Sequence, residues 1–510
     1  MHKHLLVIGL LVPAAGFGQH KALDITTYGA KGDGQTDNTV AIQKAVDAAA
    51  GRGGQVVVPA GRFVTGPLTL KSGVDLHLAK GAMLLGSTHR LDYGTVATSL
   101  LNATNQQNVS ITGQGTIDGR GQELVQDLLA ELKAGTLQDP EWQVKRPTEK
   151  NRPQLVLLTG CRKVRVTGVT FKNSASWVQA YRECTDMVVD SIRVESTAYW
   201  NNDGIDFVDC RNVQLSNSFF NAADDGICLK SENPQSRCEN ITVTNCTVRS
   251  SASAFKLGTG SFGSFKNIKV NGLTVYDTFR SAIALETVDG AVLEDIDIRN
   301  VTAKNTGNAI FLRLGHRKGE APGTLRRVYI GNVKAEIPAG KPDQGYAIEG
   351  PVFKEPHNVN PASIVGLPGH LVQDVTLENI DIRYAGGNRK TVAYASLDSL
   401  ARVPERPANY PEFSMFGELP AYGFYVRHAQ GITFKNVRIS SSGADYRPAL
   451  VFDDVQQLIL QQVTVPTTPS QPTLVLRDVP APQLKQVSLP GLKQQATLVQ
   501  GRQQPNSSRL

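Results

Sequence analysis

Short runs of alternating apolar and polar residues recur along most of the chain. Five consecutive copies begin at Cys161, Cys184, Cys210, Cys238 and Phe265, and their starts are separated by 23, 26, 28 and 27 residues. Each copy reads as an apolar residue, two polar residues, a short alternating strand, a small or amide residue at a bend, and a second short strand. This pattern predicts a right-handed parallel β-helix whose coils stack about 4.8 Å apart.

The repeat predicts one elongated all-β domain over residues 19–480. Further copies begin at Leu293, Leu325, Val372, Gly431 and Leu458. Residues 36–50 have apolar positions at helical spacing and then a Gly-rich stop, which predicts a helix that caps the open N-terminal end of the solenoid. After Pro480 the pattern weakens, so we expect residues 481–510 to form a weakly structured tail.

Three stretches interrupt the rhythm of the coils. A run of leucines at helical spacing follows Arg120 and is expected to pack on the flank of the solenoid. Residues 338–370 and 386–420 are long and rich in proline. Loops of this length in a compact architecture usually form functional walls or lids.

Four of the six cysteines open successive coils. We therefore expect them to form one interior column of reduced, small apolar side chains. The sequence has no CxxC pair or Cys/His cluster that would favour a metal site. A disulfide framework, which an exported chain would allow, is the less favoured alternative.

Residues 1–18 combine a basic start, an apolar run and small residues before Gln19, as in a signal peptide. Export to the periplasm or the medium is therefore expected, with a buried N-terminal strand as the alternative. No other stretch has the ~20 apolar residues needed to span a membrane.

The net charge is +7, but the basic residues are scattered, so we expect no nucleic-acid partner. A mildly basic surface suits an acidic polysaccharide, although an unselected charge balance explains it equally well. We expect a monomer.

Carboxylates gather in two short segments, "WNNDGIDF" and "AADDGICLK". Asp203 and Asp224 are 21 residues apart, close to one circuit, so they should lie on neighbouring coils of one face. Lateral offset would bring the carboxylates toward the roughly 6.5–9.5 Å separation of an inverting glycosidase. Asp224 and Asp225 would point to opposite faces of a plain strand, so the chain must bulge or turn there, which Gly226 permits.

Three clustered acids cannot all stay ionised easily, so the pKa of one should rise and make it a proton donor. General acid and general base cleavage of a glycosidic bond requires this arrangement. Turn capping by Asp is the alternative, and we favour it for Asp206 and Asp209. A calcium site is less favoured because few other oxygen ligands lie nearby in the sequence.

Four motifs carry a resemblance to a known family: "YGAKGDGQTDNTVAIQKAVD" at Tyr28, "GQGTIDGRG" at Gly113, "NNDGID" at Asn201 and "DDGICLK" at Asp224. Over residues 24–468 the chain resembles glycoside hydrolase family 28, the polygalacturonases and rhamnogalacturonan hydrolases, which fold as right-handed parallel β-helices.

The family's Asn-Thr-Asp motif matches Asn201, Asn202 and Asp203, and its paired aspartates match Asp224 and Asp225. The resemblance implies that Asp224 is the general acid, that Asp203 and Asp225 hold and activate the water, and that Asn201 binds substrate. It implies no metal and no cofactor.

Two further family motifs are missing. Ser253 stands where the family has the histidine of Gly-His-Gly, and Ala284 and Glu286 replace the arginine and lysine of Arg-Ile-Lys. In the family that pair typically grips a uronic acid carboxylate. An unpaired Glu286 would repel a uronide, which argues against simple polygalacturonan as the substrate.

Three basic residues could compensate for the missing pair. Lys256 should fall in the column of Ala284, while Lys230 and Arg313 should flank Glu286 in its own column. These residues, with Glu286, are candidates for substrate binding. An equal alternative is an outward salt-bridge ladder in which Lys230 and Arg313 neutralise Glu286.

The sequence thus predicts an exported β-helix that hydrolyses a glycosidic linkage in a pectin-type polysaccharide or oligosaccharide with inversion. The long loops favour exo-action on short chains. Trp177, Tyr199 and Trp200 could stack on sugar rings, although packing is favoured. A polysaccharide lyase on the same architecture and a non-catalytic carbohydrate-binding solenoid are the alternatives.

Overall fold

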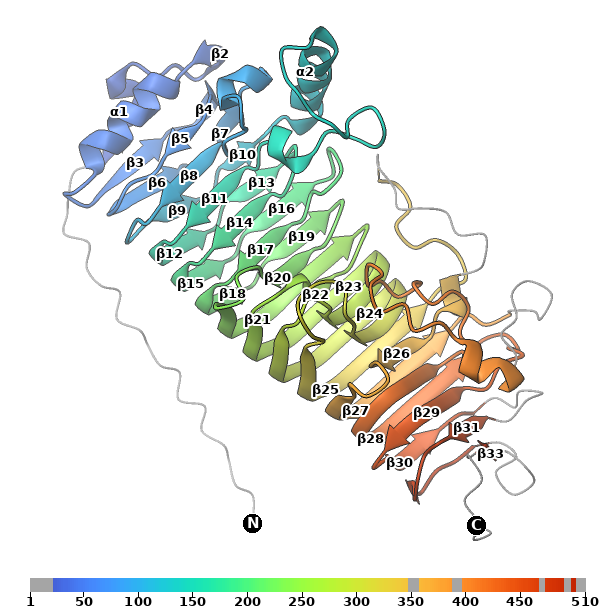
Figure 1. The fold of residues 1–510 in the computed structure, drawn as a ribbon. Coiled ribbons are helices and arrows are strands. Elements are labelled where there is room, and N and C mark those ends of the chain that lie inside the picture. The colour runs from blue at the N-terminus through green and yellow to red at the C-terminus, as the bar shows by residue number, and fades with distance from the viewer. Residues whose placement is uncertain (1–21, 347–356, 388–396, 467–472, 490–496, 501–510) are drawn as a thin grey trace, which may run out of the picture.

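The computed structural model describes residues 22–346, 357–387, 397–466, 473–489 and 497–500. The predicted signal segment lies outside these residues. The described strands form one continuous stack in which each strand pairs in parallel with its equivalent in the next coil (Figure 1). For example, Val166 aligns with Val189, Val189 with Leu215, and Leu215 with Val243. The predicted parallel β-helix is confirmed.

The solenoid has three faces, which we name in the order that the chain visits them. The first face contains β1 (Leu23–Asp24), β3 (Gly54–Val58), β6 (Val74–Leu78), β9 (Ser110–Gly113), β12 (Arg162–Thr167), β15 (Thr185–Asp190), β18 (Arg211–Ser216), β30 (Ile459–Thr464) and β32 (Gln483–Lys485). The second face contains β2 (Asp33–Asp37), β4 (Gly61–Thr65), β7 (Ala82–Gly86), β10 (Thr116–Asp118), β13 (Thr170–Lys172), β16 (Arg193–Ser196) and β19 (Phe219–Ala222).

The third face carries the candidate site. It contains β5 (Leu68–Thr69), β8 (Leu101–Thr104), β11 (Val156–Thr159), β14 (Gln179–Arg182), β17 (Ile205–Val208), β20 (Ile227–Ser231), β22 (Phe255–Ser261), β26 (Ala362–Val365), β29 (Leu450–Gln456), β31 (Leu474–Arg477) and β33 (Thr497–Gln500). Longer strands bend around more than one face: β21 (Arg237–Ser250), β23 (Ser264–Thr287), β24 (Val292–Leu314), β25 (Thr324–Ile337), β27 (Val372–Tyr384) and β28 (Phe424–Ser441).

The interior is filled by inward-facing side chains that stack from coil to coil. The predicted cysteine column is present: Cys161, Cys184, Cys210 and Cys238 are free and fully buried, and Cys238 aligns with Phe265. The thiols donate to backbone carbonyls of the preceding coils, as Cys210 does to Tyr181 at 3.1 Å. These side chains therefore act as small packing groups rather than as cross-links.

Asparagines support the bends at the edges of the faces. The Asn240 side-chain amide donates to Asn212 at 3.1 Å, and that of Asn267 donates to Asn240 at 2.7 Å. All three residues have positive φ, which asparagine adopts more readily than most residues. The amide column joins equivalent turns of successive coils.

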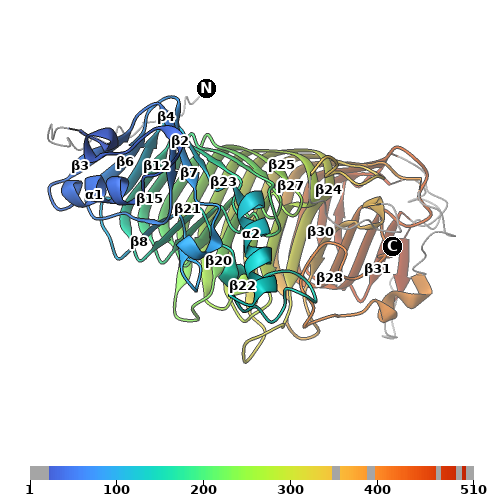
Figure 2. The same cartoon turned by 90° about the horizontal axis from the view of Figure 1, so that it is seen from above.

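Two α-helices accompany the coils. The N-terminal helix α1 (Thr39–Ala49) buries Ile42, Ala45, Val46 and Ala49 against the solenoid core near β1, β3 and β5 (Figure 1). Helix α2 (Gly121–Ala134) projects from the flank, as Figure 2 also shows. Its first turns pack on the core, whereas later leucines form a separate small cluster with Leu137 and the partly buried Trp142. No helix among the described residues is long and apolar enough to cross a membrane.

Strand pairing continues beyond residue 480. Strand β32 pairs with β30, and β33 pairs with β31. The prediction that residues 481–510 form only a weakly structured tail is therefore wrong for these two segments. The strands are short, so their alternation did not stand out in the sequence.

Five short 3-10 helices lie in the described connections. They are η1 (Ile25–Tyr28), η2 (Arg90–Tyr93), η3 (Glu149–Asn151), η4 (His357–Val359) and η5 (Leu397–Arg402). The connection from β27 to β28 contains η5 and then residues 403–423, which we call the return segment. It packs apolar side chains, among them Phe413 and Phe416, against Phe279 and Phe311 of the solenoid.

Candidate active site

The three predicted aspartates lie at the turns that lead into the third face. Asp203 precedes β17, and Asp224 and Asp225 precede β20 in the next coil. The Gly204 backbone N–H donates to the Asp225 carbonyl at 2.8 Å, which stacks the two turns directly. Carboxylate oxygens of Asp203 and Asp225 lie within 4.8 Å of each other. The structure therefore brings the acids of the two segments together on neighbouring coils.

Asp224 and Asp225 point in different directions because the chain turns at this pair. The Asp224 carboxylate accepts a hydrogen bond from the Asp225 backbone N–H at 2.9 Å, and that of Asp225 accepts one from the Ser253 N–H at 3.0 Å. Asp224 stays partly exposed, whereas Asp225 is buried. Gly226 is required for space rather than for a special φ: a Cβ there would lie 2.3 Å from Val248 Cγ1.

Buried lysines pair with the acids on the third face. Lys230 Nζ lies 3.2 Å from Asp203 Oδ2, forms a closer ion pair with Asp206, and sits 4.0 Å above the Trp177 ring. Lys256 Nζ donates to Asp225 Oδ2 at 2.9 Å. Each lysine is at most 8% exposed, so these pairs are sheltered from solvent.

The different partners separate the pKa values of the acids. Burial, and after it the charge of Asp225, raises the pKa of Asp224. Burial would also raise the pKa of Asp225, but Lys256 and Arg280 outweigh it and lower that pKa. Asp224 is therefore the carboxyl that more readily keeps its proton, and Asp225 is the one that more readily stays ionised. General acid and general base catalysis needs one carboxyl of each kind.

Asp203 and Asp206 share one lysine. Burial raises the pKa of Asp203 well above its usual value, and the charge of Asp206 adds to the effect. Burial raises the pKa of Asp206 to about 6, although Lys230 opposes it. Two close acids with one cation retain a proton between them.

The prediction that Asp206 only caps a turn is wrong. Asp206 lies within β17, is fully buried, and pairs with Lys230. The sequence suggested a turn because "DGI" occurs twice, but the register places Asp206 one residue into the strand, aligned with Cys228. Asp209 does cap a turn, as predicted: it accepts from the backbone N–H groups of Glu232 and Asn233.

The columns predicted for Lys256 and Arg313 are correct, but the predicted salt-bridge ladder, in which Lys230 and Arg313 neutralise Glu286, is absent among the described residues. Lys256 aligns with Ala284, and Glu286 aligns with Arg313. However, Lys230 pairs with aspartates, and the cation nearest to Glu286 Oε2 is Lys256 Nζ at 3.9 Å. Burial raises the pKa of Glu286 to about 8, so this side chain holds its proton near neutral pH and does not act as a fixed negative charge.

Arg313 holds the return segment instead of facing the acids. Its fully buried guanidinium donates to the carbonyls of Gly366 at 3.0 Å and Glu405 at 2.6 Å, and lies over the Phe416 ring. The geometry gives Arg313 a structural role, which contradicts its selection as a substrate-binding residue.

Asn201 and Asn202 shape the turn before Asp203. The Asn201 amide lies 3.5 Å from Asp224 Oδ2, and its side-chain oxygen accepts from Arg152 at 2.7 Å. The fully buried Asn202 side chain donates to the carbonyls of Ser174 and Ser176 in the preceding coil and accepts from the backbone N–H groups of Ala198 and Tyr199. Asn201 therefore reaches the acid cluster, and Asn202 holds the turn.

The sequence reasoning missed Arg280, Tyr410 and Glu412. Arg280 is partly exposed, acts electrostatically on Asp224 and Asp225, and has Nε 3.4 Å from Glu412. Tyr410 OH lies 2.9 Å from Lys256 Nζ, although the residue as a whole is 46% exposed. Arg280 could have been found by counting the register one coil beyond Ser253. The return segment has no repeat that would have placed Tyr410 or Glu412.

The three predicted aromatic residues differ in exposure. Trp177 is buried beneath Lys230, and Tyr199 is partly buried against the core. Trp200 is 38% exposed beside the acids. Packing therefore accounts for the first two, and Trp200 remains open to solvent.

The donor set near the acids does not suit calcium. Asp203, Asp225 and Cys228 lie close enough to share an ion, but Lys230 and Lys256 already occupy the two carboxylates. A thiol is also a poor ligand for a hard cation.

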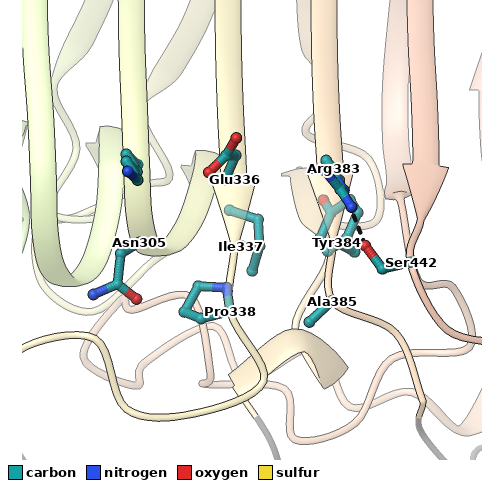
Figure 3. Close-up of a pocket in the computed structure, with 9 residues that line it drawn as sticks. Asn305, Glu336, Ile337, Pro338, Arg383, Tyr384, Ala385 and Ser442 are labelled. Carbon is teal, nitrogen blue, oxygen red and sulfur yellow. Dashed lines mark hydrogen bonds between the residues drawn. The ribbon is translucent and has the colours of Figure 1, made fainter.

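A separate surface pocket of about 230 Å³ lies between the middle of β24 and the C-terminal ends of β25 and β27 (Figure 3). Its lining includes Asn305, Glu336 and Arg383, and Arg383 donates to Ser442 at 2.9 Å. None of the predicted acids lines it. Its alternating charges on neighbouring coils form a surface ladder rather than a reaction site.

Known proteins resemble this chain in sequence and in fold. An exo-poly-alpha-D-galacturonosidase from Dickeya chrysanthemi is 34% identical over 250 residues, which cover 41% of either chain. An exopolygalacturonase from Zea mays is 25% identical over 400 residues, 77% of this chain and 82% of that one. The solved exopolygalacturonase structure from Thermotoga maritima superposes with a TM-score of 0.57 at 24% identity, covering 71% of this chain and 87% of that one, which shows the shared fold.

The family model of glycosyl hydrolases family 28 matches residues 50–396, a range that includes every predicted acid. Because this match covers more than half of the chain, the protein belongs to glycosyl hydrolases family 28 and is a glycoside hydrolase.

Proposed function

We propose that this protein hydrolyses glycosidic bonds in pectin-type chains with inversion, using Asp224 as general acid. The observation that carries the proposal is the contrast between adjacent carboxyls. Asp225 is buried and ion-paired with Lys256, whereas Asp224 is partly exposed and has no lysine partner among the described residues. One group is thereby set to hold a proton and the other to accept one.

The reaction follows from this contrast. Asp224 gives its proton to the oxygen of the leaving sugar as the bond from that oxygen to the anomeric carbon breaks. A water attacks the opposite face of that carbon and loses its proton to Asp225. Asp203, 4.8 Å or less from Asp225, supplies a second oxygen ligand for the water.

Chain-end cleavage is the mode that the return segment favours. Tyr410 contacts Lys256, and Glu412 contacts Arg280, so this segment stands over the site on the side of the later coils. A wall at one side limits how far a polymer can extend past the acids. Relatives named for exo-action are consistent with this proposal.

A pectic substrate also accords with export of the protein, because such polymers lie outside cells. Cleavage after residue 18 and a monomeric state remain predictions. A lyase or a non-catalytic solenoid is not favoured, because the chain belongs to glycosyl hydrolases family 28.

The direct test compares the wild type with Asp224→Asn on galacturonate and rhamnogalacturonan oligosaccharides, reading released reducing sugar. We expect the variant to lose activity by at least about 10²-fold with an unchanged circular dichroism spectrum. Unsaturated products that absorb in the ultraviolet would indicate a lyase. Glycan binding without turnover in the wild type would indicate a binding module.

A further inference from the structure

The segment between α2 and β11 brings two arginines to the turn that carries the acids. Arg152 is buried, and its donors are bonded to the carbonyls of Pro147, Ala175 and Trp200 and to the side chain of Asn201. Four of the five N–H donors of Arg152 therefore hold the turn. Burial closes the guanidinium to a ligand.

Arg146, unlike Arg152, is open to solvent and to a ligand. It is partly exposed, and its guanidinium carbon lies 5.4 Å from the centre of the Trp200 ring. Across the part of the chain that the structure describes, it pairs with no carboxylate. A guanidinium that stacks on an aromatic ring keeps its in-plane N–H donors, and these match both oxygens of a carboxylate.

Arg146 and Trp200 lie next to the turn that carries the acids. Trp200 directly precedes Asn201, whose amide reaches Asp224 Oδ2 at 3.5 Å. The 38% exposure of Trp200 leaves part of the indole free to cover the apolar side of a sugar. A sugar held there would lie beside the turn that carries Asn201, whose amide faces the general acid.

We propose that Arg146 and Trp200 form a subsite for an acidic sugar, in which Arg146 binds the uronate carboxylate and Trp200 covers the ring. This inference rests on the proposed function and specifies its substrate class. The other cations at the site, Lys230, Lys256 and Arg280, each face an acid of the protein. Unlike these three cations, Arg146 has no acidic partner among the described residues, so its positive charge is free for a ligand.

Binding is tested in the Asp224→Asn background, in which turnover should be at least about 10²-fold slower, by calorimetry with trigalacturonate and with its fully methyl-esterified form. Arg146→Gln should weaken binding of the acid about tenfold and leave binding of the ester nearly unchanged. Trp200→Ala should weaken the binding of both the acid and the ester. Lys145→Gln, an exposed lysine of the same segment, is the matched control and should change neither.

The outcomes separate this inference from the proposed function. Tight binding of trigalacturonate that Arg146→Gln does not alter, or equal losses for acid and ester, would overturn the subsite while the hydrolase stands. Loss of circular dichroism signal in Arg146→Gln would identify a structural role and would also overturn it. If the wild-type enzyme releases no sugar from any pectic oligosaccharide, the proposed function itself fails.

Discussion

Asp224 and Asp225 are neighbours in sequence but have different partners in the fold. The spacing of 21 residues was enough to predict that they meet Asp203, because the coil length fixes which residues lie on adjacent rungs. The partners of each acid could not be predicted in the same way. Lys256 reaches Asp225 from the next coil, but Arg280 approaches from β23 and Tyr410 from the distant return segment.

Lys256 keeps the pKa of Asp225 low, so removing its charge should alter the pH dependence of catalysis. In Lys256→Met the pKa of Asp225 should rise, because burial then acts unopposed by the nearest cation. The base would lose its charge at a higher pH. We expect the acidic limb of the kcat/KM profile to move upward by about one pH unit or more.

The control for this measurement is Lys269→Met, which removes an exposed lysine from β23. It should leave the profile in place. An acidic limb that stays at the wild-type pH in Lys256→Met would show that Asp225 is not the group that titrates there.

At the scale of elements, the return segment is the part whose position in the fold could not be predicted from the sequence. The coils were predictable since their apolar period repeats, whereas residues 403–423 have no period and are fixed by individual contacts. Arg313 holds the backbone of Glu405, and the Glu405 carboxylate lies 2.8 Å from Arg427 and 3.1 Å from His428. A long loop was expected to be a wall, but these anchors come from strands three or more coils beyond Asp224 and Asp225.

His428 makes this anchor depend on pH. Its ring nitrogens lie 3.1 Å from Glu405 and 2.6 Å from Asp454, so both contacts are hydrogen bonds only when the ring is charged. Burial opposes the charge, but the two carboxylates outweigh it and raise the pKa of His428, while Arg427 lowers it slightly. A folded pKa above the unfolded value means that the stabilisation is complete below about pH 6.5 and is lost as pH rises through the raised pKa.

His428→Gln should therefore lower the free energy of unfolding by about 1 kcal/mol near pH 5.5 and by much less near pH 8.5. Thermal unfolding at the two pH values measures this difference. His316→Gln serves as the control, because this histidine is partly exposed and its side chain contacts the nearby Gly319 carbonyl rather than a carboxylate. An equal loss at both pH values would mean that His428 contributes packing rather than charge.

Over the whole molecule, coil spacing is the quantity that connects the fold to the chemistry. The acids belong to different coils, so their separation is set by how closely the coils stack and not by any local loop. Gly204 and Gly226 lie where successive turns touch, and a Cβ on Gly204 would be 2.5 Å from the Gly226 carbonyl oxygen. The sequence showed two "DG" pairs, but it could not show that they stack on each other.

Gly226→Ala tests whether this stacking sets the catalytic geometry. The added methyl group would lie 2.3 Å from Val248 Cγ1 and 2.9 Å from the Ala254 carbonyl oxygen, so the turn carrying Asp225 must move away from the next coil. We expect a loss of about 1–3 kcal/mol in stability and a fall of about 10²-fold in kcat, because the acids would no longer hold one water between them. Gly340→Ala is the matched control, since a Cβ there has no neighbour within 4 Å. Thermal unfolding and initial rates on a pectic oligosaccharide measure both effects. If Gly226→Ala lost stability but kept its kcat, the contact would serve the fold alone, and the position of Asp225 would have to be fixed by Lys256 and the Ser253 N–H instead.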